Sequence, residues 1–304
     1  MTQMTLAGMV GAADHVTTSF LTQTYPALAA AVSTPIYLAA VLYWALFGYK
    51  IYAGHSPLAW KDFLAKAVLT AAVFGTLSWG GLASAIYNAF VSFMEGAAGT
   101  IMAGESTASM LDALSKNVTT VSNILQASEF YQLAMIMAGM LLLVLNCALF
   151  VVALFYMTIA KFGLAITMVF LPLFAGFFLF DQTRHWGTNW LNKMLTFSIM
   201  YILVIAIVRL GFLAFGDAIE ATGRIAQATS IGGAATDAAL VSAQSANLAI
   251  VEGVLILFML SVRSWAAALA SGAASSTGVL MMVIRAALTK GAPPAAAASR
   301  GGSK

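Results

Sequence analysis

Charged residues are scarce in this sequence. Of its 304 residues only 8% are charged, with 14 basic and 11 acidic side chains, whereas 61% are hydrophobic. A soluble domain usually carries about 25% charged residues, and a folded surface needs them to remain soluble. The composition therefore argues against an ordinary soluble enzyme, and a net charge of +3 is too small to indicate a nucleic-acid-binding groove.

Residues that build catalytic and metal sites are also few. A single cysteine, Cys147, excludes a disulfide framework and a cysteine-rich zinc site. The histidines, His15, His55 and His185, are scattered, and neither a zinc-binding His-Glu-x-x-His motif nor a phosphate-binding Gly-Lys-Ser/Thr loop is present. We therefore expect no enzyme activity, no cofactor and no metal ion. Cys147 lies within an apolar run and is expected to be a small buried packing residue.

Long stretches of the chain contain no ionisable side chain of Asp, Glu, Lys, Arg or His. They are Ala67–Met94, Phe130–Ala160, Phe162–Phe180 and Ser264–Ile284. A helix needs about 20 apolar residues to cross the core of a bilayer, and several of these runs are long enough. The sequence predicts an all-α, polytopic helical integral membrane protein with five to six transmembrane helices and additional amphipathic interfacial helices.

The pattern of charge and hydrophobicity divides the chain into five parts. We predict an amphipathic interfacial N-terminal segment (1–25), a first transmembrane hairpin (26–94), a periplasmic loop with an amphipathic helix (95–129), a membrane core (130–284) and a disordered basic cytoplasmic tail (285–304).

Cap signals set the predicted ends of the first hairpin. Thr34-Pro35 reads as an N-cap followed by proline at the first helical position, and this helix should end at Gly54. Ser56-Pro57 repeats the signal, and the second helix should run to Met94. Its three glycines, Gly75, Gly80 and Gly81, permit close helix approach or a bend.

The loop 95–129 contains its own apolar stripe at spacings of three and four residues. The stripe comprises Leu111, Leu114, Val118, Val121 and Leu125 and is too short for an independent coiled coil. It either packs on the membrane or on the protein's own bundle, or it offers a docking surface to another subunit.

Lysine and arginine remain on the cytoplasmic side of a membrane, which predicts a periplasmic N-terminus and a cytoplasmic C-terminus. Under this rule the loops 95–129 and 217–247 both lie in the periplasm, so an even number of crossings must separate them. The sequence has three apolar segments between these loops, which is an odd number. The conflict disappears if the segment with Pro172 and Gly176 does not cross. This scheme has five membrane crossings. Six crossings, or seven if residues 264–284 also cross, are the alternatives.

Several charged, small and aromatic residues within or beside the apolar segments suit specific roles. Arg209 and Glu252 lie within apolar segments, where each either reaches the interface separately or pairs with the other. Ala266 and Ala270 belong to a small-residue stripe that favours close helix packing, either within one subunit or between subunits. Trp190, between Arg184 and Lys193, either belongs to an interfacial aromatic belt or anchors a hinge.

Two stretches resemble the TrbL-like family of type IV secretion proteins. The first is Leu171-Pro172-Leu173-Phe174, followed by Thr183-Arg184 and Trp190-Leu191, and the second runs from Ser261 to Gly272. The second departs from the family pattern at Arg263, where the family usually has proline, and at Ser271-Gly272, where a glycine pair is usual. Together the resemblance covers about half of the chain, from Phe130 to Ala274.

The resemblance implies a platform or channel subunit in the bacterial inner membrane that supports translocation of DNA–protein or effector substrates and assembly of a conjugative pilus. It further implies a homo-oligomer, with a fivefold ring as the expected form. Expected partners are pilin subunits, secretion ATPases and other type IV secretion components, the phospholipid bilayer and, transiently, the translocated substrate. A small channel or secondary transporter is the alternative; a transporter usually shows two related halves with matching broken helices.

Overall fold

The structure is a computed structural model that describes residues 6–55, 60–103, 119, 133–230 and 235–274. Every regular element in these residues is a helix. In chain order they are α1 (Leu6–Tyr52), α2 (Trp60–Gly75), the π-helical turn η1 (Trp79–Ala83), α3 (Ser84–Ile101), α5 (Leu133–Val169), α6 (Leu171–Phe177), α7 (Arg184–Ser230) and α8 (Ala235–Ala274).

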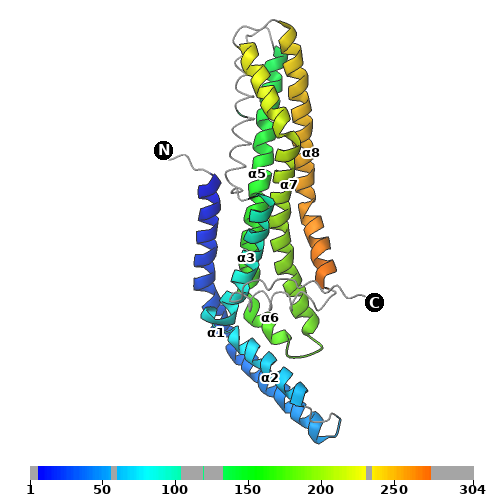
Figure 1. Ribbon diagram of the computed structural model, residues 1–304. Coiled ribbons are helices and arrows are strands. Elements are labelled where there is room, and N and C mark those ends of the chain that lie inside the picture. Colours follow the sequence, from blue (N-terminus) through cyan, green and yellow to red (C-terminus); the bar gives the residue numbers. More distant parts are fainter. Residues whose placement is uncertain (1–5, 56–59, 104–118, 120–132, 231–234, 275–304) are drawn as a thin grey trace, which may run out of the picture.

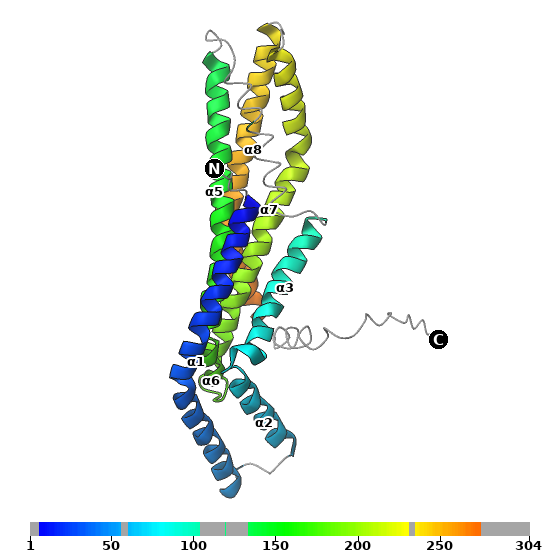
Figure 2. The same ribbon diagram turned by 90° about the vertical axis from the view of Figure 1, so that its left-hand side faces the viewer.

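An elongated bundle of α5, α7 and α8 forms the centre of the molecule (Figure 1). Helix α1 packs on α5, and α3 packs on α7. Figure 2 shows α1 and α2 forming a hairpin at the end of the molecule opposite to the α7–α8 connection. Helix α7 contacts α3, α5, α6 and α8, and α5 contacts α1, α6, α7 and α8, so these two helices connect the bundle.

Two glycines allow the central helices to approach closely. A Cβ atom on Gly163 of α5 would lie 2.4 Å from the ring of Phe197 on α7. A Cβ atom on Gly211 of α7 would lie 2.7 Å from Leu255 of α8. Close packing of this kind holds helices together in lipid, where burial of apolar surface between helices gives no net drive.

Within the part of the chain that the structure describes, four helices are long and apolar enough to cross a membrane: Gly11–Tyr52, Ile136–Val169, Arg184–Gly211 and Ala246–Ser271. A fifth candidate span consists of Trp60–Gly75 and Trp79–Ile101, which meet at 94°. The chain is therefore an all-α polytopic membrane protein, as predicted. The five candidates are the same segments that the five-crossing scheme uses.

The first hairpin differs from the prediction in one respect and agrees in two. The predicted helix start at Thr34-Pro35 is wrong, because α1 is continuous from Leu6 and contains Pro26 and Pro35. The expected separate N-terminal segment (1–25) is thus joined to the first span. The predicted stop is confirmed, since Gly54 has a φ of 72° just beyond the end of α1. The permitted bend near Gly75 is also present.

The membrane core also contains longer helices than the sequence indicated. The apolar segments 130–160 and 162–180 are not two spans, because α5 continues through Lys161 to Val169 and only the short α6 follows. The expected loop 217–247 is mostly helical, because α7 extends to Ser230 and α8 begins at Ala235. The apolar segment 248–262 and residues 264–274 form one helix, α8, rather than two crossings.

Candidate functional site

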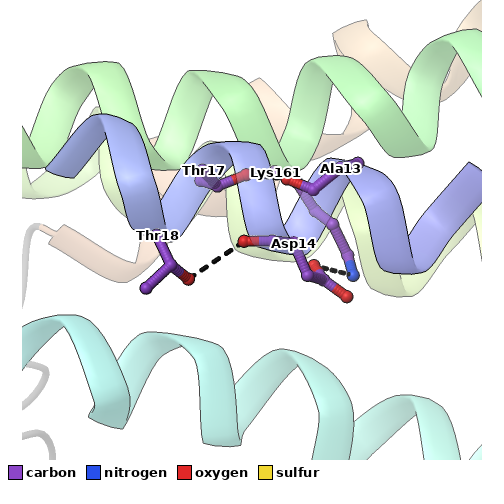
Figure 3. A network of polar contacts seen from close by, with 5 residues as sticks. All are labelled: Ala13, Asp14, Thr17, Thr18 and Lys161. Atoms are coloured by element: carbon purple, nitrogen blue, oxygen red, sulfur yellow. Dashed lines mark hydrogen bonds and ion pairs between the residues drawn. The ribbon is translucent and has the colours of Figure 1, made fainter. Parts of the chain in front are cut away.

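An ion pair joins α1 to α5 inside the bundle (Figure 3). The ammonium Nζ of Lys161 on α5 donates to Oδ1 of Asp14 on α1. The Lys161 side chain is 9% exposed and that of Asp14 is 50% exposed. The same ammonium lies 5.5 Å from the centre of the Tyr201 ring on α7. Three helices therefore share one buried cation, which would be strongly disfavoured between apolar helices without a partner.

The surroundings of this pair are polar as well. On α1, the Thr17 hydroxyl donates to the carbonyl of Ala13, and that of Thr18 donates to the carbonyl of Asp14 at 2.9 Å. The described cluster thus holds one carboxylate and one ammonium where α1, α5 and α7 meet.

A second buried polar contact joins α5 to α8. The amide Nδ2 of Asn146 donates to Oε1 of Glu252 at 3.5 Å, and both residues are buried. The predicted ion pair between Arg209 and Glu252 is wrong, because no ion pair of the described residues joins them. Glu252 on α8 instead accepts a hydrogen bond from the Asn146 amide on α5.

The residues between α5 and α7 form a compact hinge. Pro172 lies in the first turn of α6, directly after the break at Phe170. The indole Nε1 of Trp190 donates to the Thr167 carbonyl near the end of α5 at 2.8 Å. Its ring stacks on Phe174 of α6, with ring centres 6.0 Å apart. Trp190 on α7 is 4% exposed and therefore contacts both other helices of the hinge.

Arg184 lies at the start of α7, on the outside of the same hinge. Its guanidinium is 4.0 Å from the carboxylate of Asp181, and both side chains are mostly exposed. The structure thus brings Pro172, Arg184 and Trp190 together, whereas Arg209 and Glu252 lie further along the bundle. An exposed pair of this kind contributes little to stability, so the hinge depends mainly on Trp190.

The break between α2 and α3 is held by α1. Tyr25 is fully buried, its hydroxyl donates to the carbonyl of Thr76, and its ring lies 5.1 Å from that of Trp79. A Cβ atom on Gly81 would come within 3.1 Å of the Gly75 carbonyl, so a larger residue there would crowd the bend. Irregular backbone at membrane depth needs internal hydrogen-bond partners, and Tyr25 supplies one.

Removing this hydroxyl should weaken the bend. We expect Tyr25→Phe to lower the free energy of unfolding by about 1–3 kcal/mol, because the buried Thr76 carbonyl loses this donor. Tyr37→Phe is the matched control, since Tyr37 is 59% exposed. Unfolding midpoints in detergent would test this; equal midpoints for both variants would show that the hydroxyl does not support the bend.

The small residues of α8 face the interior of the chain. Ala266 and Ala270 are 0% and 1% exposed. The structure therefore supports packing of this stripe within one subunit, because neither side chain reaches the surface of the chain.

Ala270→Leu should consequently act on the fold rather than on assembly. Overpacking a buried position costs about 1–3 kcal/mol, so the unfolding midpoint in detergent should fall. Ala268→Leu, at an exposed position of the same helix, should leave it unchanged. An unaltered midpoint combined with a smaller assembled fraction on native gels would instead place the stripe between subunits.

The remaining predicted residues have different outcomes. Cys147 is exposed, so the expectation that it is buried was wrong. Leu114 and Val118, with the rest of their stripe, lie outside the described residues. Among the described residues no three side chains of His, Cys, Asp or Glu come together as a metal site would require.

Sequence reasoning missed Asp14, Asn146 and Tyr25. A signal existed for the ion pair, because Lys161 is the sole charge between Phe130 and Phe180, and a lone cation there calls for an acid on another helix. Asn146 could have been noticed as an amide in an otherwise apolar run. Tyr25 gave no signal that separates it from other interfacial aromatic residues.

Comparison with known proteins places the bundle in a family. The family described as TrbL/VirB6 plasmid conjugal transfer protein matches residues 40–262, from the second half of α1 into α8. Two relatives from Bartonella henselae and Bartonella quintana, each described as type IV secretion system protein VirB6, are 28% identical over 199 residues. The matched part covers 60% of this chain and 58% of each relative. Because the family match covers well over half of its 304 residues, the protein belongs to the TrbL/VirB6 family of plasmid conjugal transfer proteins.

Proposed function

We propose that this protein is an inner-membrane platform or channel subunit of a type IV secretion system. It supports translocation of DNA–protein or effector substrates and assembly of a conjugative pilus. The observation that carries the proposal is the family match across residues 40–262, which includes the hinge and parts of all five candidate spans. The names of the two relatives support the same system.

Affinity purification in mild detergent tests this proposal. Expected partners are pilin subunits, secretion ATPases and further copies of this chain in a ring. The amphipathic stripe with Leu114 and Val118 is proposed as one docking surface, so Leu114→Asp/Val118→Asp should reduce co-purification while the protein level is maintained. A homogeneous preparation without any secretion component, from cells that express the whole system, would contradict the proposal.

A secondary transporter or small channel is the second candidate, and one observation favours it. Helices α2 and α3 form a broken span with a bend of 94°, and broken helices build the substrate sites of many transporters. Substrate-dependent uptake into vesicles by the purified chain alone would support this alternative, whereas complementation of conjugation in a deletion strain would support the secretion role.

The proposed orientation places the N-terminus in the periplasm and the C-terminus and the α6–α7 hinge in the cytoplasm. His185→Cys and Lys193→Cys should therefore resist an impermeant thiol reagent added from the periplasm, whereas Ser115→Cys should react. His185 and Lys193 are both exposed, so protection would reflect the membrane. The exposed Cys147 must first be replaced by serine. Periplasmic labelling at His185 would overturn this orientation.

A further inference from the structure

Glu252 has an incompletely satisfied carboxyl group in the interior of the bundle. The residue is 5% exposed, and its neighbour Asn146 is 6% exposed. Oxygen Oε1 accepts from the Asn146 amide at 3.5 Å. The second oxygen, Oε2, is buried and has no hydrogen-bond partner among the described residues.

Among the described residues, no cation of the neighbouring helices forms an ion pair with Glu252. Helix α8 packs against α5 and α7. On α7, Arg209 lies near the contact between Gly211 and Leu255, and its guanidinium is not within ion-pair distance of the Glu252 carboxylate.

Two further basic residues of the described parts of α5 and α8 do not reach Glu252. Lys161 of α5 lies 15 positions beyond Asn146, about 22 Å along the helix, and is bound to Asp14. Arg263 of α8 lies 11 positions beyond Glu252, about 16 Å along the helix, and is exposed. An ionised carboxylate without a cation is strongly disfavoured between apolar helices.

A protonated carboxyl group resolves this conflict, because it carries no charge and its Oε1 still accepts from the Asn146 amide. We propose that Glu252 is a proton-binding site: the carboxylate takes one proton from water, and the neutral acid joins Asn146 to hold α8 against α5. Release of that proton to water would leave an unpaired charge between the two helices, so their packing depends on the proton.

Infrared spectroscopy of the full chain in lipid, with 13C-labelled glutamate and at neutral pH, tests the protonation state. A protonated carboxyl group gives a C=O band that ionised carboxylates lack. The wild type should show this band, Glu252→Gln should lose it, and the control Glu95→Gln, at an exposed position of α3, should retain it. Absence of the band in the wild type, or its persistence in Glu252→Gln, would overturn the proposal.

Unfolding midpoints in detergent test the contact with Asn146. Glu252→Gln should match the wild type, because an amide resembles the neutral acid in shape and bonding. Glu252→Leu and Asn146→Leu should each lower the midpoint by several degrees, and the double variant should recover part of the loss, because no polar group is then left unpaired. A marked rise in the midpoint of Glu252→Gln would show that the wild type carries a buried charge and would contradict the proposal.

Discussion

Asp14→Leu should destabilise the folded chain by about 1–3 kcal/mol. Removing one partner of a buried ion pair costs about 3–5 kcal/mol because the other charge is left unpaired, and the half exposure of Asp14 reduces this value through screening by water. Lys161 would then lie between α1, α5 and α7 without its carboxylate. The unfolding midpoint in detergent and the protein level in the membrane should both fall.

The double variant Asp14→Leu/Lys161→Leu distinguishes a pair from two independent effects. It should recover part of the loss, because the uncompensated ammonium is removed as well. Asp62→Leu, which removes an exposed acid from α2, controls for the loss of negative charge. Strictly additive single effects would show that the two residues do not stabilise each other.

Trp190→Ala should have the largest effect of any substitution in the hinge. Truncating a buried aromatic side chain costs about 3–5 kcal/mol, and the hydrogen bond to the Thr167 carbonyl is lost as well. We expect conjugative transfer or effector secretion to fall sharply, together with the unfolding midpoint, because α5, α6 and α7 lose their common contact.

Two further variants separate the roles of this tryptophan. Trp60→Ala is the control, since Trp60 is 82% exposed and suits an interfacial belt. Trp190→Phe retains the stacking on Phe174 but lacks the N–H group, so it should cost about 1 kcal/mol. Equal and mild effects of the alanine substitutions would leave Trp190 with an interfacial role alone.

The sequence predicted the parts of the fold that follow from local composition. The charge-free runs Ala67–Met94 and Phe130–Ala160 marked two of the candidate spans, Pro172 marked the break after α5, and Gly54 marked the end of α1. These features depend on neighbours in the chain, because helix breaking and capping are local. The hinge residues Pro172, Arg184 and Trp190 were found for the same reason, since they lie close together in the sequence.

The orientation of each helix about its axis could not be predicted in the same way. In the predicted amphipathic segment 1–25, the apolar residues Val16 and Phe20 are exposed, whereas Thr17 and Leu21 are buried. In lipid the apolar face of a helix does not have to be the buried one. Helix α5 is apolar on all sides, so its sequence pattern does not indicate which side is buried. For this reason Cys147 was predicted to be buried, although it is exposed.

The polar contacts between helices were missed for a related reason. Asp14 and Lys161 are 147 positions apart, and Asn146 and Glu252 are 106 positions apart. Their pairing depends on which helices are neighbours and on relative depth, and neither property is encoded in spacing along the chain. Arg209 and Glu252 were predicted as one possible pair, but no ion pair of the described residues joins them.

The helices of the α7–α8 hairpin are longer than a membrane crossing requires. Helix α7 has 47 residues and α8 has 40, which gives lengths of about 70 Å and about 60 Å at 1.5 Å per residue. The hydrocarbon core of a bilayer is only about 30 Å thick. Each of these helices therefore extends well beyond a single crossing of the core, and a tilt of a few degrees at the hinge would displace the far end of α7 by several ångströms.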